Sequence, residues 1–172
     1  LRPMSNGAVF KDIADRYDRL NTLLSLGQDQ KWRNTVVARL PEGRLLDLGG
    51  GTGAANTIFG TREVVALDPA PEMLALNDAA YRVVAVGEDL PFDDGSFDAV
   101  FSAYVFRNLD SVERTMEEVA RVLRPGGMAG IVDLARPSGS VSSKVHRAGT
   151  AVVLPLAGMS IGVDWNYVST GV

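Results

Sequence analysis

The chain has 172 residues, of which 46% are hydrophobic, and this is enough to bury the core of one ordinary domain. Its formal net charge of -4 argues against a basic groove for nucleic acid, so we expect no nucleic-acid partner. The absence of cysteine excludes a disulfide framework and thiolate metal ligands, and a single histidine disfavours a histidine metal site. Catalysis is therefore expected to use oxygen and nitrogen side chains, or a bound cofactor, without a metal.

The sequence gives no sign of a targeting or membrane-spanning segment. The N-terminal residues lack the basic, apolar and small-residue order of a signal peptide, so a cytoplasmic location is expected. The longest uncharged run, 148–163, is interrupted by Pro155 and is short for a membrane-spanning helix. That run is still compatible with contact to a membrane surface or to a hydrophobic ligand. Because the chain begins with Leu1, we expect the gene product to begin earlier.

The first part of the chain predicts helices followed by a strand. Apolar residues at helical spacing over 9–40 predict two or three short helices, broken near Gly27. The apolar run 44–48 then leads into the glycines of 49–53, which predicts a strand, a loop and a helix from about Ala54.

The middle of the chain alternates strand and helix signals. Strands are predicted at 63–67, 82–86, 97–102 and 128–134, and helices at 71–79 and 111–123, the second of them capped by Ser111. Strands that alternate with helices predict a Rossmann-like α/β domain, in which a mostly parallel sheet is covered by helices on both faces.

Segment 47–53 has the features of a loop that binds a cofactor. Glycines 49, 51 and 53 remove Cβ atoms that would block a ligand, and they permit positive φ angles. The N-terminus of the helix predicted after the loop would favour a negative group. Asp68, at the end of the second predicted strand, can accept hydrogen bonds from both hydroxyls of a ribose. Together these residues predict a pocket for an adenosine-containing cofactor.

Two classes of cofactor fit this loop. Gly49, Gly51 and Ala54 satisfy the G-x-G-x-x-G/A spacing of dinucleotide enzymes. The third glycine at position 53, and the acidic Asp47 just before the loop, favour the pattern of S-adenosylmethionine (SAM) methyltransferases. In that reading Asp47 receives the ammonium of the methionine part, which NAD lacks. A glycine turn in a binding fold without a cofactor is the third interpretation.

Four segments carry a likeness to a known family: 9–27 followed by Trp32-Arg33, then 46–53, then 88–100, and finally 106–109 followed by 121–127. Segments 46–53 and 88–100 are common among methyltransferases, whereas 9–27 and the Arg107-Asn108 pair are more particular. Together they resemble the UbiE-type C-methyltransferases of menaquinone and ubiquinone biosynthesis. The resemblance extends from about residue 9 to about residue 137, and weakly to Tyr167.

The resemblance implies a SAM-dependent methyltransferase with a class I fold in a single domain, 1–172. In that domain, 1–40 form an N-terminal helical lid, 43–134 the SAM-binding core and 138–172 an apolar helical segment. The family continues into two further strands that complete a seven-stranded sheet, whereas this chain stops at Val172. Those C-terminal strands are therefore expected to be missing, which leaves a sheet edge exposed.

The implied reaction is C-methylation of a reduced demethylated polyprenyl quinone, a demethylmenaquinol or a ubiquinone precursor. By the resemblance, Arg107 holds a phenolate, or a water that takes its proton, and Asn108 orients the other ring oxygen. Tyr17 and Asp18 are expected to help close a lid over the cofactor. Met73, one turn into the second predicted helix of the core, is expected to cover the adenine ring. The alternative for all five is an ordinary packing or surface role.

Two positions depart from the pattern of the family. Val86-Gly87 stand where such enzymes usually carry an Asp followed by Ala, so the backbone of Gly87, or Glu88, is expected to recognise the adenine edge. Val105-Phe106 stand where small residues usually precede the Arg-Asn pair, and they are expected to narrow or reshape the ring pocket.

Several partners and functions stay open. The uncharged run 148–163 fits reception of a polyprenyl tail at a membrane surface, packing on the sheet edge, or packing on a second subunit in a homodimer. The alternative functions are methylation of another small molecule, nicotinamide-dependent oxidoreduction, and a non-catalytic role in quinone assembly. A comparison of SAM binding with NAD binding separates the implied methyltransferase from a nicotinamide-dependent oxidoreductase.

Overall fold

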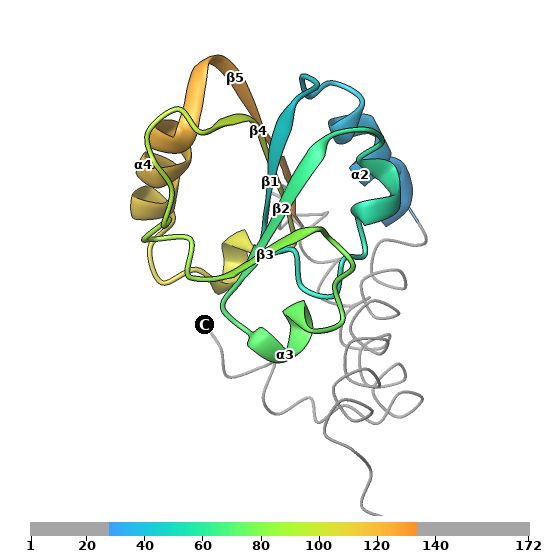
Figure 1. The fold of residues 1–172 in the computed structure, drawn as a ribbon, viewed down its shortest axis with the longest axis horizontal. Helices are drawn as coiled ribbons and strands as arrows, with labels where there is room; N and C mark the ends of the chain where they lie inside the picture. The colour runs from blue at the N-terminus through green and yellow to red at the C-terminus, as the bar shows by residue number, and fades with distance from the viewer. Residues whose placement is uncertain (1–27, 134–172) are drawn as a thin grey trace, which may run out of the picture. The chain divides into compact units, whose positions relative to one another are not determined.

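The structure is a computed structural model that describes residues 28–133. In chain order it contains α2 (Asp29–Val37), β1 (Arg44–Leu48), the 3-10 helix η1 (Asn56–Ile58), β2 (Glu63–Asp68), α3 (Pro71–Leu74), β3 (Tyr81–Val84), β4 (Phe97–Ala103), the 3-10 helix η2 (Phe106–Asn108), α4 (Val112–Val122) and β5 (Leu123–Val132). These strands form a sheet of order β3-β2-β1-β4-β5 in which all neighbours are parallel. Helices α2 and α4 lie on opposite sides of it (Figure 1). The expected Rossmann-like α/β fold is therefore confirmed.

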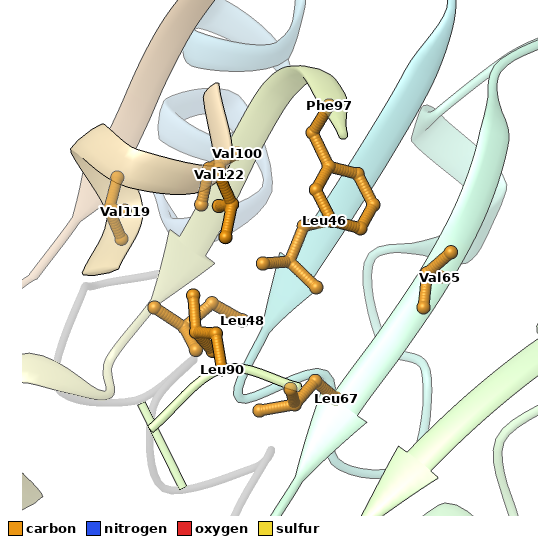
Figure 2. Close-up of a cluster of buried hydrophobic side chains, with 9 residues drawn as sticks. All are labelled: Leu46, Leu48, Val65, Leu67, Leu90, Phe97, Val100, Val119 and Val122. Atoms are coloured by element: carbon orange, nitrogen blue, oxygen red, sulfur yellow. The ribbon is translucent and has the colours of Figure 1, made fainter. Parts of the chain in front are cut away.

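The face of the sheet under α4 holds a hydrophobic core. It consists of Leu46, Leu48, Val65, Leu67, Leu90, Phe97, Val100, Val119 and Val122, all of them buried (Figure 2). Because side chains alternate along a strand, Leu46 and Leu48 of β1 point to this face, and the intervening Asp47 points to the other.

The opposite face carries Asp47 and is covered by α2. In the sheet, Asp47 is paired with Phe101 of β4, and Phe101 is paired with Gly130 of β5, so these residues share one face. A Cβ on Gly130 would lie 2.4 Å from a methyl carbon of Val36 in α2, so the helix packs directly on this glycine. Asp47 therefore lies on the face that α2 covers.

Helix α4 begins as predicted. The Ser111 hydroxyl oxygen accepts a hydrogen bond from the N–H of Arg114 at 3.1 Å, which confirms Ser111 as the cap. Within α4, the buried Glu118 accepts hydrogen bonds from the N–H of Leu90 at 2.9 Å and from Arg121 Nη2 at 2.7 Å. These bonds, with that to Arg121 contributing most, lower the pKa of Glu118 to about 2. The helix is thereby attached to the segment that follows β3.

The prediction of a helix from about Ala54 is wrong. Only the short η1 forms there, with N–H groups that bond three residues back, such as Ile58 to Ala55 at 3.0 Å. Gly60, at a φ of 66°, then turns the chain away. The expectation that a helix N-terminus after the loop favours a negative group therefore fails with it.

Two other boundaries differ from the prediction. The helix expected at 71–79 ends at Leu74, because the buried Asn77 turns its side chain inward to bond other segments. The last strand begins at Leu123 instead of residue 128, since β5 pairs with Phe97 of β4 from its first residue. Within residues 28–133, no helix combines the length and the hydropathy needed to cross a membrane.

Candidate cofactor and substrate site

The glycine loop after β1 has the backbone conformation that its sequence predicts. Gly49, Gly51 and Gly53 have φ angles of 74°, 47° and 87°. The N–H of Gly49 donates to the carbonyl oxygen of Leu67 in β2 at 2.8 Å, which ties the start of the loop to the sheet. A Cβ on Gly51 would meet only Asp68 Oδ2 at 3.8 Å and the terminal methyl of Met73 at 4.0 Å. The loop therefore leaves space beside Gly51 that Asp68 and Met73 border.

Asp68 holds the loop through its carboxylate. Its Oδ2 accepts from the N–H of Gly51 at 3.0 Å, and its Oδ1 accepts from the N–H of Ala70 at 2.9 Å. Burial raises the pKa of Asp68, and these two N–H groups oppose the rise. Each carboxylate oxygen has a second lone-pair site, so Asp68 still has acceptor capacity for a ribose hydroxyl.

Asp47 is a buried carboxylate with an unused oxygen. Only 3% of the residue is exposed, and burial raises its pKa to about 7, against the opposing effect of Arg33 and with a smaller contribution from Asp68. Its Oδ2 has no hydrogen-bond partner among the described residues. An ammonium group would supply both the missing donors and the missing charge, so this residue fits the amino-acid end of SAM.

Asn77 is a component of the site that the sequence did not reveal. Its side-chain nitrogen donates to the carbonyl oxygens of Gly50 at 3.3 Å and Gly51 at 3.1 Å. Its Oδ1 accepts from the N–H of Ala79 and from the side chain of Asn56, both at 2.9 Å. Asn77 therefore fixes the conformation of the loop from a segment outside the sheet. It lies 26 residues after Gly51, so no local sequence pattern links it to the glycines.

Gly87 and Glu88 lie against the start of α4. Gly87 is buried, and a Cβ there would lie 3.0 Å from the Thr115 methyl carbon. Glu88 Oε1 accepts from the N–H groups of Asp110 at 2.9 Å and Ser111 at 3.2 Å. Burial acts to raise the pKa of Glu88, but the backbone hydrogen bonds together outweigh it and lower that pKa. Glu88 thus helps to fix the turn before α4, and recognition of adenine by Gly87 or Glu88 stays a prediction.

Arg107 and Asn108 lie in η2, which follows β4 directly, and both residues are exposed. The Arg107 guanidinium carbon lies 5.8 Å from the ring centroid of Tyr104, the residue after β4. Val105 connects this segment to the glycine loop, because a Cβ on Gly49 would lie 2.2 Å from a methyl carbon of Val105. The structure therefore brings the start of the segment that carries the expected substrate residues next to the expected cofactor loop.

Tyr104 and Arg33 are two further residues at this edge that sequence reasoning missed. Tyr104 is buried at a φ of 63°, and the guanidinium carbon of Arg33 in α2 lies 5.2 Å from its ring centroid. Nothing in the local pattern marks the left-handed backbone of Tyr104, because that region is unfavourable for a residue with a Cβ. Tyr17, Asp18 and the run 148–163 lie outside the described residues.

The carboxyl ends of three neighbouring strands thus carry the candidate site. β1 contributes Asp47 and the glycine loop, β2 contributes Asp68, and β4 leads into Tyr104 and η2. In an open parallel sheet this is the edge where ligands bind. The unused oxygen of Asp47 and the space beside Gly51 fit a cofactor that joins an amino acid to a nucleoside.

The comparisons with known proteins agree with this arrangement. Demethylmenaquinone methyltransferase of Thermus thermophilus is 39% identical over 168 residues, which cover 87% of this chain and 75% of the relative. A ubiquinone/menaquinone biosynthesis C-methyltransferase UbiE of a Geobacter species is 35% identical over 169 residues, which cover 88% and 72%.

A solved structure shows the same fold. It is a SAM-dependent methyltransferase of Thermotoga maritima, described as a possible histamine N-methyltransferase, and it matches with a TM-score of 0.65 at 22% identity over 85% of this chain and 70% of that one. The model of the ubiE/COQ5 methyltransferase family matches residues 4–169. The chain therefore belongs to the ubiE/COQ5 methyltransferase family.

Proposed function

We propose that this protein transfers the methyl group of SAM to a ring carbon of a reduced, demethylated polyprenyl quinone. The observation that carries the proposal is the contact between Val105 and Gly49, which joins the glycine loop to the segment that continues into Arg107 and Asn108. The relatives named demethylmenaquinone methyltransferase support a naphthoquinol as the acceptor.

The loop residues have distinct roles toward the cofactor. SAM, when bound, supplies a methyl group activated by its sulfonium. Asp47 receives the ammonium of the amino-acid end, and Asp68 accepts from the ribose hydroxyls while it holds Gly51 in place. Met73 lies next to the space beside Gly51 and is suited to cover the adenine ring, whose edge the backbone of Gly87, or Glu88, recognises.

The substrate residues bind and orient the ring. A hydroquinone becomes a carbon nucleophile when the hydroxyl adjacent to the reacting carbon loses its proton. The positive guanidinium of Arg107 stabilises the resulting phenolate, or the water that takes the proton, and Asn108 orients the second ring oxygen. As the new carbon–carbon bond forms, the methyl–sulfur bond breaks, and the ring carbon then releases its own proton. Tyr17 and Asp18 help to exclude water.

The acceptor is lipophilic, and this bears on location. The uncharged run 148–163 is suited to receive a polyprenyl tail. We therefore also propose that the protein is cytoplasmic and contacts the membrane surface when it takes up its substrate. Association of two copies through the same run is the alternative use of these residues.

The proposal is tested by methyl transfer from labelled SAM to a chemically reduced demethylmenaquinone analogue, with SAM and NAD binding measured by calorimetry on the same sample. Label is expected on the ring of the reduced acceptor, and none on the oxidised quinone, which serves as the control. SAM binding without transfer would exclude this acceptor, and NAD binding without SAM binding would exclude a methyltransferase.

Arg107 offers a sharper test of the substrate side. Arg107→Ala is expected to lower kcat by about 100-fold or more, since it removes the charge that stabilises the phenolate, with the affinity for S-adenosylhomocysteine changed by less than about twofold. Arg124→Ala is the matched control, because Arg124 pairs with Asp98 at the opposite end of β4. Equal losses of turnover and cofactor affinity in Arg107→Ala would contradict the substrate role.

A further inference from the structure

The 3-10 helix η2, which carries Arg107 and Asn108, is a single turn of three residues. The N–H of Asn108 donates to the carbonyl oxygen of Val105 at 2.8 Å, which closes this turn. Within residues 28–133 no side chain caps its N-terminus, and none of its own residues is buried. A 3-10 turn has weaker hydrogen-bond geometry than an α-helix. The orientation of η2 therefore depends on the segments that hold its two ends.

The C-terminal end of η2 is tied to the segment that follows β3. Glu88 Oε1 accepts from the N–H of Asp110 at 2.9 Å and from the N–H of Ser111 at 3.2 Å. These two N–H groups belong to the second and third residues after Asn108. Hydrogen bonds to a carboxylate are stronger than those to a neutral acceptor. Glu88 thus holds the chain directly after the residues expected to bind the acceptor.

A second contact joins the same two segments through Gly87. A Cβ on Gly87 would lie 3.4 Å from Leu109 Cδ2 and 3.0 Å from the methyl carbon of Thr115, so both side chains pack against its backbone. Thr115 is fully buried, and its hydroxyl donates to the carbonyl oxygen of Ser111 at 2.9 Å. Ser111 is therefore bonded both by Glu88 from the segment after β3 and by Thr115 from within α4.

The two ends of η2 thus contact two different segments that are expected to bind the cofactor. Val105 packs on Gly49 of the glycine loop at the start of η2, and Glu88 bonds the residues after its end. Arg107 and Asn108 lie between these contacts. A displacement of about 1 Å in a group that orients a substrate can cost on the order of 100-fold in rate. The hold on the ends of η2 therefore bears directly on the acceptor.

We propose that Glu88 is a positioning residue for the methyl acceptor, whose carboxylate holds Arg107 and Asn108 in place through the N–H groups of Asp110 and Ser111. The inference rests on the proposed function and adds to it a division of labour within one segment. The backbone of the segment after β3 faces the cofactor side of the proposal, and the Glu88 side chain serves the acceptor side. The same segment thereby links the two substrates of the transfer.

The first test compares turnover with cofactor affinity. Glu88→Ala is expected to lower kcat/KM for a chemically reduced demethylmenaquinone analogue by about tenfold, because two N–H groups lose their acceptor and η2 loses its hold. The affinity for S-adenosylhomocysteine, measured by calorimetry, should change by less than about twofold. Glu88→Gln should retain most of the turnover, since its amide oxygen can accept from the same N–H groups.

Asp98→Ala is the matched control, because Asp98 Oδ2 accepts from the N–H of Arg44 at 2.8 Å at the opposite end of β4. It should leave kcat/KM and cofactor affinity unchanged.

A double-mutant cycle separates positioning from a general loss of structure. In the Arg107→Ala background, Glu88→Ala should lower kcat/KM by less than about threefold, the part that acts through Asn108. A readout without turnover is amide hydrogen exchange measured by NMR. The N–H groups of Asp110 and Ser111 should exchange about tenfold faster in Glu88→Ala and at the wild-type rate in Glu88→Gln.

The outcomes distinguish this inference from the proposed function. Equal losses of kcat/KM in the two backgrounds, unchanged turnover in Glu88→Ala, or a loss confined to S-adenosylhomocysteine affinity would overturn the positioning role while methyl transfer by the wild type stands. A wild-type chain that transfers no methyl group would overturn the proposed function and the positioning role together. If Glu88→Ala does not fold, Leu109→Ala, which removes the contact with Gly87, is measured in the same cycle, and equal losses there would overturn the role.

Discussion

The side-chain nitrogen of Asn77 lies 3.1 Å from the carbonyl oxygen of Gly51, which precedes it by 26 residues in the chain. The segment after α3 thereby fixes the conformation of the loop after β1. The glycines allow the positive φ angles of that loop, but a distant amide selects one conformation among those that glycine permits. The shape of the candidate cofactor site therefore depends on packing as well as on the glycine motif.

Substitution of Asn77 is expected to affect both stability and binding. Asn77→Ala removes the donor for two loop carbonyls and leaves the N–H of Ala79 without its acceptor, so we expect the free energy of unfolding to fall by about 2–3 kcal/mol. Urea denaturation measures this, and calorimetry should show weaker S-adenosylhomocysteine binding. Asn34→Ala, at an exposed position of α2, is the control. Unchanged binding by a folded Asn77→Ala variant would remove Asn77 from the loop's support.

The contact between Gly49 and Val105 gives a coupled prediction. In Gly49→Ala the new methyl would lie 2.2 Å from a methyl carbon of Val105, and φ is positive, so both a clash and backbone strain result. We expect a loss of about 3 kcal/mol or more in the free energy of unfolding. In the Val105→Ala background the clash is relieved and the loss should shrink to about 1–2 kcal/mol of strain. If the losses in the free energy of unfolding caused by Gly49→Ala and Val105→Ala simply add in the double variant, as measured by urea denaturation, the contact would be refuted.

The buried Asp47 predicts a pH dependence of stability. Its pKa is raised from 3.8 to about 7, so between these values the folded state keeps a proton that the unfolded state has released. The free energy of unfolding therefore falls as the pH rises from about 4 to about 7, by up to about 4 kcal/mol from this group. The raised pKa of Asp68 acts in the same direction.

Asp47→Asn isolates this contribution. The difference in unfolding free energy between the variant and the wild type, measured by urea denaturation at several pH values, should move in favour of the variant as the pH rises through that range. The contributions of the other carboxyl groups to the pH dependence cancel in this difference, because both proteins contain them. A difference that is independent of pH would show that Asp47 titrates normally.

Asp68 is expected to bind the ribose of the cofactor. Asp68→Ala should weaken S-adenosylhomocysteine by about tenfold or more, since it removes the carboxylate that accepts from the hydroxyls and orients Gly51. Methylthioadenosine and its 2′-deoxy analogue separate the two effects. The wild type should prefer the ligand with both hydroxyls, and the variant should lose that preference. A preference that survives the substitution would place the ribose elsewhere.

The sequence by itself determined the fold and the edge of the sheet at which the candidate site lies. Apolar runs such as 44–48, separated by helical segments, predict parallel strands, because hydrophobic patterning is a local property of a chain. The positions of Asp47, the glycines and Asp68 at the ends of two such runs then follow from the topology of the sheet. The cap at Ser111 was likewise predictable, since it joins two residues only three positions apart in the chain.

The tertiary structure alone decided how the site is completed. Asn77 bonds the glycine loop, Val105 packs on Gly49, and Arg33 reaches Tyr104 from α2, and each of these contacts joins segments far apart in the sequence. The failure of the helix expected from Ala54 has the same origin, because helical spacing cannot show that the chain turns at Gly60 instead. Local patterns record which backbone is favoured, whereas the burial of individual polar groups is settled only when the segments pack together.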